Sequence, residues 1–111
     1  LNKGLHFLKA GDHVVTINTL YGPASNLIGS YLVEKMGITV SYVSGLDPEE
    51  FRSAIRENTS LIYLESPSTA VYALQDISAV TELARGCGIR TVIDNTWATP
   101  CFQKPLQMGV D

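Results

Sequence analysis

Short apolar segments rich in β-branched residues alternate along the chain with segments whose apolar residues recur at helical spacing. The strand-like segments are 13–18, 38–43, 60–64 and 91–93. Because they are apolar almost throughout, rather than at every second position, we expect each strand to be buried on both faces. Strands of this kind form parallel sheets that helices cover on both sides. The alternation therefore predicts an α/β fold with a parallel sheet and three layers, α/β/α.

Helix-start and helix-stop residues bound the segments between these strands. Pro23 suits the first position of a helix that ends at Gly37. Asp47 is a good N-cap for a second helix, and either Asp76 or Ser78 caps a third. These boundaries predict one crossover helix after each of the first three strands, and such crossovers are right-handed in nearly all proteins.

Three further segments carry weaker signals. Residues 5–10 resemble the end of a helix that Gly11 closes, residues 97–103 are predicted to be irregular, and residues 104–108 are predicted to form a short helical turn.

Length and charge exclude several classes of function. The chain has 111 residues and a net charge of −3, with no cluster of Lys or Arg, so we expect a single domain and no nucleic-acid partner. No apolar run approaches the roughly 18 residues that a membrane span requires, so no membrane partner is expected. No signal peptide opens the chain, and we expect a cytoplasmic protein.

The two cysteines and the two histidines offer little chemistry. Cys87 and Cys101 are too few for a disulfide framework and lack the spacing of metal ligands. Cys87 falls on the apolar face of the third helix and is predicted to lie in the core, whereas Cys101 is predicted to be more exposed. His6 and His13 have no ligand spacing, and we interpret both as structural.

Ligands of parallel α/β sheets bind beyond the carboxyl ends of the strands. In this chain that rule selects the segments 19–22, 44–45, 65–69 and 94–97. Polar residues gather in most of them, so this edge of the sheet is the expected place for a functional site.

Asp94 is the most informative residue at that edge because it directly follows a buried strand. A carboxylate at such a place is costly unless it meets a cation or a hydrogen-bond donor. A cationic ring nitrogen, such as that of pyridoxal phosphate (PLP), would satisfy it. Capping of the following turn would satisfy it equally well. A metal-bound phosphoryl acceptor is disfavoured, because no second acidic residue accompanies Asp94 near the end of its strand.

Other residues at the same edge admit two interpretations each. Tyr21 follows the first strand, where its ring could stack on a planar ligand and its hydroxyl could transfer a proton, or it could simply pack. Glu65 ends an apolar strand, and structural pairing is the favoured interpretation. The Ser66, Ser68 and Thr69 cluster fits either a turn or hydrogen bonds to a ligand, and Trp97 either packing or a pocket wall.

Four segments, in this order and spacing, resemble the Cys/Met-metabolism family of PLP-dependent enzymes. They are Leu8–Val14, Tyr21–Pro23, Leu64–Pro67 and Asp94–Pro100. The resemblance covers nearly the whole chain. It implies the large domain of a fold-type I, aminotransferase-like enzyme, with PLP as cofactor and a sulfur amino acid as substrate. It also implies that the intact protein is a homotetramer.

The resemblance assigns roles to particular residues. Asp94 matches the aspartate that pairs with the cofactor's pyridine nitrogen, and Tyr21 matches the tyrosine that stacks on the cofactor ring and is implicated in proton transfer. Thr96 matches a position beside the ring. Many family members have Asn-Pro where this chain has Thr69-Ala70. That departure, together with Trp97, favours a cystathionine β-lyase over cystathionine γ-synthase, cystathionine γ-lyase and methionine γ-lyase.

The family's cofactor-binding lysine follows the Asp94 motif in a Ser-x-Thr-Lys stretch, which this sequence does not contain. The first residue is not Met, and we therefore expect an interior piece of a larger cofactor domain, spanning 1–111 and incomplete at both ends. By itself such a piece is expected to be inactive. The alternative from another functional class is a self-contained, non-catalytic α/β binding module of flavodoxin-like type.

Overall fold

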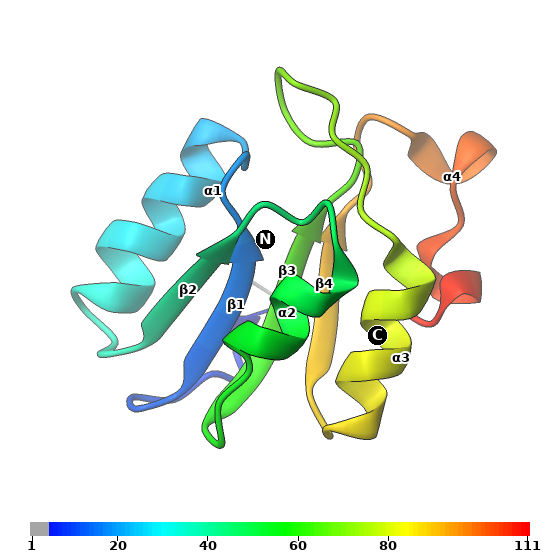
Figure 1. The fold of residues 1–111 in the computed structure, drawn as a ribbon. Coiled ribbons are helices and arrows are strands. Elements are labelled where there is room, and N and C mark those ends of the chain that lie inside the picture. Colours follow the sequence, from blue (N-terminus) through cyan, green and yellow to red (C-terminus); the bar gives the residue numbers. More distant parts are fainter. Residues whose placement is uncertain (1–4) are drawn as a thin grey trace.

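A computed structural model describes residues 5–111 of the chain (Figure 1). The strands are β1 (His13–Ile17), β2 (Thr39–Val43), β3 (Thr59–Glu65) and β4 (Arg90–Asp94). The helices are α1 (Gly22–Asn26), η2 (Leu27–Val33), α2 (Pro48–Ala54), α3 (Ile77–Gly86), α4 (Thr99–Phe102) and η3 (Pro105–Met108). Every strand expected from the sequence is present, with each end displaced by no more than two residues.

The four strands described form one parallel sheet in the order β2-β1-β3-β4. The chain passes from β1 to β2 toward one edge and later from β3 to β4 toward the other. The strand order therefore reverses between β1 and β3, and ligands of open α/β sheets bind at such a reversal, outside the carboxyl ends of the strands.

Two apolar cores lie on opposite faces of the sheet. On one face Val14 and Tyr63 pack with Ile28 and Leu32 of the α1–η2 segment. On the other face, alternate residues of the same strands pack against Phe51 of α2 and Val80 of α3. Figure 1 shows α2 and α3 in front of the sheet. The structure thus has the predicted three layers, and β1 is buried along its whole length.

Local sequence signals set where the helices α2 and α3 begin, as expected. Asp47 caps α2 through a capping box in which its side chain accepts a hydrogen bond from Glu49 N–H at 2.9 Å. Asp76, rather than Ser78, caps α3 by accepting a hydrogen bond from Ala79 N–H at 3.0 Å. The helix expected after residue 23 is continuous from α1 into η2, where the hydrogen bonding becomes that of a π-helix.

Four sequence predictions differ from the structure. The helix expected to end at Gly37 ends at Val33, and residues 34–36 form a turn. Residues 6–10 form turns rather than regular helix, and α4 gives the expected irregular segment 97–103 a short helix. Cys87 is exposed instead of buried. The reason is that α3 ends at Gly86, so Cys87 adopts the non-helical angles φ −100° and ψ 1° and does not continue the buried face.

The remaining predictions for this part of the chain stand as follows. Cys101 is exposed, as expected, and residues 105–108 form the short helical turn η3. His13 is fully buried, with its ring nitrogens 2.7 Å from the Thr59 hydroxyl and 2.9 Å from the Ser41 hydroxyl, which fits the structural interpretation. Among the described residues, no helix has the length and apolar character needed to cross a bilayer.

Gly45 closes the carboxyl end of β2 at a position that only glycine fits. Its φ of +80° lies in the left-handed region, which residues with a Cβ rarely adopt. A Cβ built there would lie 2.7 Å from Cγ2 of Ile17 and 3.0 Å from Cγ of Gln75. Both neighbours are buried, so neither has room to move away.

We therefore expect Gly45→Ala to lower the free energy of unfolding by about 2–4 kcal/mol, from backbone strain and overpacking together. Gly29→Ala is the matched control, because a Cβ there meets nothing within 4 Å. That change should raise the free energy of unfolding by about 0.5–1 kcal/mol through helix propensity. Urea unfolding followed by circular dichroism compares the two variants, and equal effects would contradict the close approach at Gly45.

Candidate functional site

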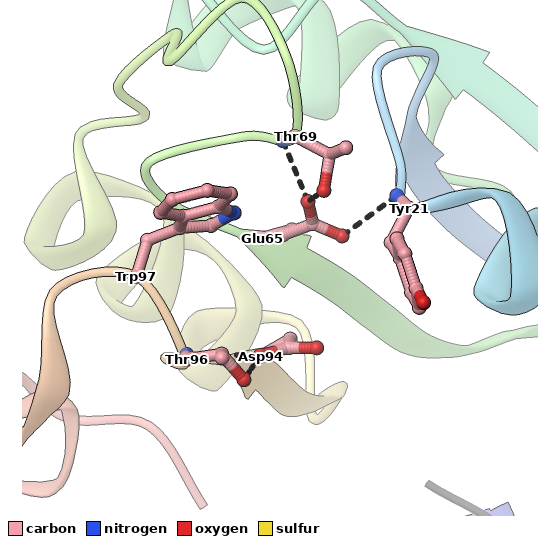
Figure 2. Close-up of a pocket in the computed structure, with 6 residues that line it drawn as sticks. All are labelled: Tyr21, Glu65, Thr69, Asp94, Thr96 and Trp97. Carbon is pink, nitrogen blue, oxygen red and sulfur yellow. Dashed lines mark hydrogen bonds between the residues drawn. The ribbon is translucent and has the colours of Figure 1, made fainter.

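A pocket of about 310 Å³ opens at the carboxyl edge of the sheet. It lies at the reversal of strand order, because Tyr21 follows β1, Glu65 ends β3 and Asp94 ends β4. Figure 2 shows the six residues that line it. They are Tyr21, Glu65, Thr69, Asp94, Thr96 and Trp97. The structure thus brings together Tyr21, Asp94 and Thr96, the three residues that the sequence selected as the site.

The two oxygens of Asp94 have different surroundings. Oδ1 accepts hydrogen bonds from the Thr96 N–H at 2.9 Å and from the Thr96 hydroxyl at 2.5 Å. Oδ2 receives no hydrogen bond from any residue that the structure describes. Asp94 therefore caps the turn after β4 and still has one acceptor oxygen for a ligand. The two interpretations left open by the sequence are compatible with each other.

Glu65 is the neighbour of Asp94 in the β3–β4 register and is almost fully buried. Its Oε2 accepts a hydrogen bond from the Tyr21 N–H at 2.9 Å, and its Oε1 accepts one from the Thr69 N–H at 2.6 Å and another from the Thr69 hydroxyl. The partners of this carboxylate are thus backbone and hydroxyl donors, not a cation. The Thr69 hydroxyl is thus directed at Glu65 and not at the pocket.

Two aromatic side chains form opposite walls of the pocket in Figure 2. Tyr21 is 53% exposed and Trp97 is 52% exposed, so both rings offer surface to a ligand. Trp97 packs edge to face against Tyr72, with ring centroids 5.1 Å apart and an interplanar angle of 82°. Nothing in the sequence indicated a role for Tyr72. Its φ of +53° and its contact with Trp97 depend on the conformation of the 66–75 loop, which no local pattern predicts.

The serine cluster belongs to the loop rather than to the pocket. Ser66 and Ser68 are buried, and their hydroxyls accept hydrogen bonds from the N–H groups of Gln75 and Ala73, each at 3.1 Å. The turn interpretation of these two residues therefore holds. Ser44, at the end of β2, likewise hydrogen-bonds to Glu50 and does not line the pocket.

The carboxylates make the pocket a favourable place for a cation. The buried hydroxyl of Tyr63 is close enough to feel their charge, and it has no hydrogen-bond partner among the described residues. Burial raises the pKa of this hydroxyl above its usual range, and the charges of Asp94 and Glu65 raise it further. A negative potential of this kind stabilises a proton on any basic group that enters the pocket.

The arrangement fits a flat, protonated heteroaromatic ring. Asp94 Oδ2 can accept a hydrogen bond from a ring N–H, and the ring of Tyr21 can stack on a planar ligand. The volume of about 310 Å³ accommodates a single aromatic ring with its substituents. None of the six lining residues is Lys or Arg, so these residues provide the ring-binding part of a site and no cation for a phosphate.

Comparison with known proteins identifies the relatives of the chain. Residues 2–111 match the model of the family described as Cys/Met metabolism PLP-dependent enzyme. A probable cystathionine γ-synthase of Herpetosiphon aurantiacus is 41% identical over 104 residues, and a cystathionine β-lyase of Bacillus subtilis is 38% identical over 104 residues. Each alignment covers 94% of this chain.

A solved structure has the same fold. The crystal structure of cystathionine γ-lyase from Lactobacillus plantarum, complexed with L-serine, matches with a TM-score of 0.95 and 37% identity over 99% of this chain. The chain spans 32% and 26% of the lengths of the two curated relatives and 29% of the crystallised one. The strand order alone is shared with flavodoxin-like folds, so it is the family match that overturns the flavodoxin-like alternative.

Proposed function

The chain belongs to the Cys/Met metabolism PLP-dependent enzyme family, and from that premise we propose that it forms part of the large, cofactor-binding domain of a carbon–sulfur lyase. The observation that carries the proposal is the pocket at the β1–β3 reversal, where Asp94 keeps one oxygen free beside an exposed aromatic wall. PLP is a planar ring with a basic nitrogen, and it matches that donor set.

Three residues of this chain would hold the cofactor ring. Asp94 Oδ2 would accept the hydrogen bond of the protonated pyridine nitrogen, and the charge of the carboxylate would keep the proton there. Thr96 holds the other oxygen of Asp94 through its N–H and its hydroxyl, which leaves Oδ2 for the ligand. The ring of Tyr21 would stack on the cofactor. When bound, PLP serves as an electron sink that stabilises negative charge at Cα of an amino-acid substrate.

Tyr21 also has a place in the proton transfers of the reaction. Tyr21 is 53% exposed and lines the pocket, so its hydroxyl could hold or release a proton beside a bound substrate. A Tyr21 ring stacked on a bound ligand would shield that face from water and so strengthen the interaction between Asp94 and a ring N–H. Tyr21 is therefore the one catalytic residue proposed within this chain, with Asp94 and Thr96 as cofactor-binding residues.

The reaction proposed for the intact protein is the cleavage of cystathionine to homocysteine, pyruvate and ammonia, as in methionine biosynthesis. Trp97 after the Asp-Asn-Thr motif and Thr69-Ala70 in place of Asn-Pro support β-elimination. The relatives at similar identity also include a γ-synthase and a γ-lyase, so γ-elimination or γ-replacement are the alternatives. We further propose a cytoplasmic homotetramer.

The products formed from cystathionine distinguish these activities. We expect the intact protein to release pyruvate, because β-elimination leaves the three-carbon part of cystathionine as the keto acid. A γ-lyase would release 2-oxobutyrate instead, and a γ-synthase would form cystathionine from an activated homoserine and cysteine. Chromatographic analysis of the keto acids decides between them, and 2-oxobutyrate as the main product would contradict the β-lyase proposal.

Asp94→Asn tests the role of the free carboxylate oxygen. The amide cannot provide the negative charge that keeps the pyridine nitrogen protonated, and a hydrogen bond to a charged group contributes about 1.5–3 kcal/mol. We therefore expect the affinity of the apo-protein for PLP to fall about 10- to 100-fold, measured by equilibrium dialysis. Glu57→Gln is the matched control, because Glu57 is exposed and lies outside the pocket. Equal affinities of Asp94→Asn and the parent protein would contradict the assignment.

We propose that the 111-residue chain by itself neither attaches PLP covalently nor cleaves cystathionine. Among the described residues, none that lines the pocket is a lysine. Mixing the chain with PLP, reducing with borohydride and analysing by mass spectrometry is expected to leave the lysines in the described part of the chain, Lys9, Lys35 and Lys104, unmodified at stoichiometric PLP. A specific adduct that disappears when one of these lysines is replaced would contradict this expectation.

A further inference from the structure

Glu65 is a buried carboxylate to which the proposed function gives no role. Its side chain is 1% exposed, and a carboxylate placed there is costly unless hydrogen bonds compensate for the lost water. Both oxygens are engaged, since Oε2 accepts one hydrogen bond and Oε1 accepts two. In contrast to Asp94, Glu65 leaves neither oxygen without a partner, so its contribution differs from that of a ligand-binding group.

The three donors come from two segments that are far apart in the sequence. The Tyr21 N–H belongs to the connection between β1 and α1, and the two groups of Thr69 belong to the loop between β3 and α3. Figure 2 shows the Glu65 carboxylate between them. Within the described part of the chain, no hydrogen bond joins residues 19–22 directly to residues 66–75, and the two segments meet only through the Glu65 carboxylate. Glu65 is therefore the polar link between these segments.

One of the two segments carries the Tyr21 wall, and the other carries Tyr72, which supports the Trp97 wall. Oε2 of Glu65 accepts a hydrogen bond from the Tyr21 N–H, so the carboxylate holds the backbone from which the Tyr21 ring extends. The loop that contains Thr69 also contains Tyr72, against which Trp97 packs. The same carboxylate thus fixes the Tyr21 wall directly and the Trp97 wall through the Thr69 loop.

We propose that Glu65 is a positioning residue that sets the separation of the aromatic walls between which the cofactor ring binds. This inference rests on the proposed function only for the identity of the ligand. A carboxylate is required, because glutamine offers one acceptor oxygen and an N–H₂ group that cannot accept the remaining hydrogen bond. Aspartate is one methylene shorter and cannot reach both segments from the end of β3.

The experiment compares Glu65→Gln with Glu57→Gln in the intact apo-protein. Glu57→Gln makes the same chemical change at an exposed position outside the pocket. Fluorotyrosine and fluorotryptophan labels report on the two walls by ¹⁹F NMR, with the resonances of Tyr21 and Trp97 assigned by Tyr21→Phe and Trp97→Phe. Equilibrium dialysis gives the dissociation constant for PLP, and circular dichroism identifies the folded variants.

We expect Glu65→Gln to shift both fluorine resonances and to raise the dissociation constant for PLP about 10- to 100-fold, the usual effect of displaced binding groups. Glu57→Gln should leave all three quantities unchanged. A residue that contributes only to stability would lower the unfolding midpoint without moving the resonances of the folded protein. Unchanged resonances and unchanged PLP affinity in folded Glu65→Gln would overturn the proposal.

Thr69→Val keeps the proposal testable if Glu65→Gln does not fold. This change removes one donor to Oε1 and leaves the carboxylate and the Tyr21 contact in place. We expect a shift of the Trp97 resonance, a smaller shift or none at Tyr21, and a several-fold weaker affinity for PLP. If neither the Trp97 resonance nor the affinity changes, the proposal is overturned.

Failure of the proposed function gives a different result. If the parent protein itself binds no PLP, the assignment of the cofactor pocket fails, whereas the fluorine resonances still test whether Glu65 positions the two walls. Movement of both resonances in Glu65→Gln, and not in Glu57→Gln, would then support the positioning role for another ligand. Unmoved resonances would overturn it.

Discussion

Parallel pairing of β1, β3 and β4 is the constraint on which the site depends. Parallel strands all end at the same edge of a sheet, so residues 21, 65 and 94 meet there although they are far apart in the sequence. The buried faces of the strands fix the register, because a shift by one residue would turn every apolar side chain to the wrong side. Glu65 and Asp94 are consequently neighbours on one face, and the apolar core determines where the polar site lies.

The two neighbouring carboxylates have different functions because their hydrogen-bond partners differ. Glu65 accepts hydrogen bonds on both oxygens from donors of two loops. Among the described residues, Asp94 accepts hydrogen bonds on Oδ1 alone, which leaves Oδ2 for a ligand. Burial alone would make either group costly, and the number of local donors decides which one is structural and which one can bind.

Several elements were predictable from local residues. The apolar runs identified the strands to within two residues, and Asp47 and Asp76 marked the beginnings of α2 and α3. Cys87 was placed wrongly because periodicity was extended one residue past the end of α3, where the backbone leaves the helix. The turn capped by Asp94 was one of two alternatives, and a pattern of residues could not show that each carboxylate oxygen serves a different purpose.

The sequence by itself determined the three-layer α/β architecture, the edge at which a site would form, and the family. Hydrophobic periodicity, capping residues and the order of motifs can all be read along the chain without knowledge of its three-dimensional contacts. Only the tertiary structure decided which residues meet in the pocket. Tyr72 supports Trp97, and Glu65 links Tyr21 to Thr69, through loops whose conformations no local pattern specifies. The physical reason is that these contacts join segments up to 44 residues apart, and they exist only after the core has fixed the sheet.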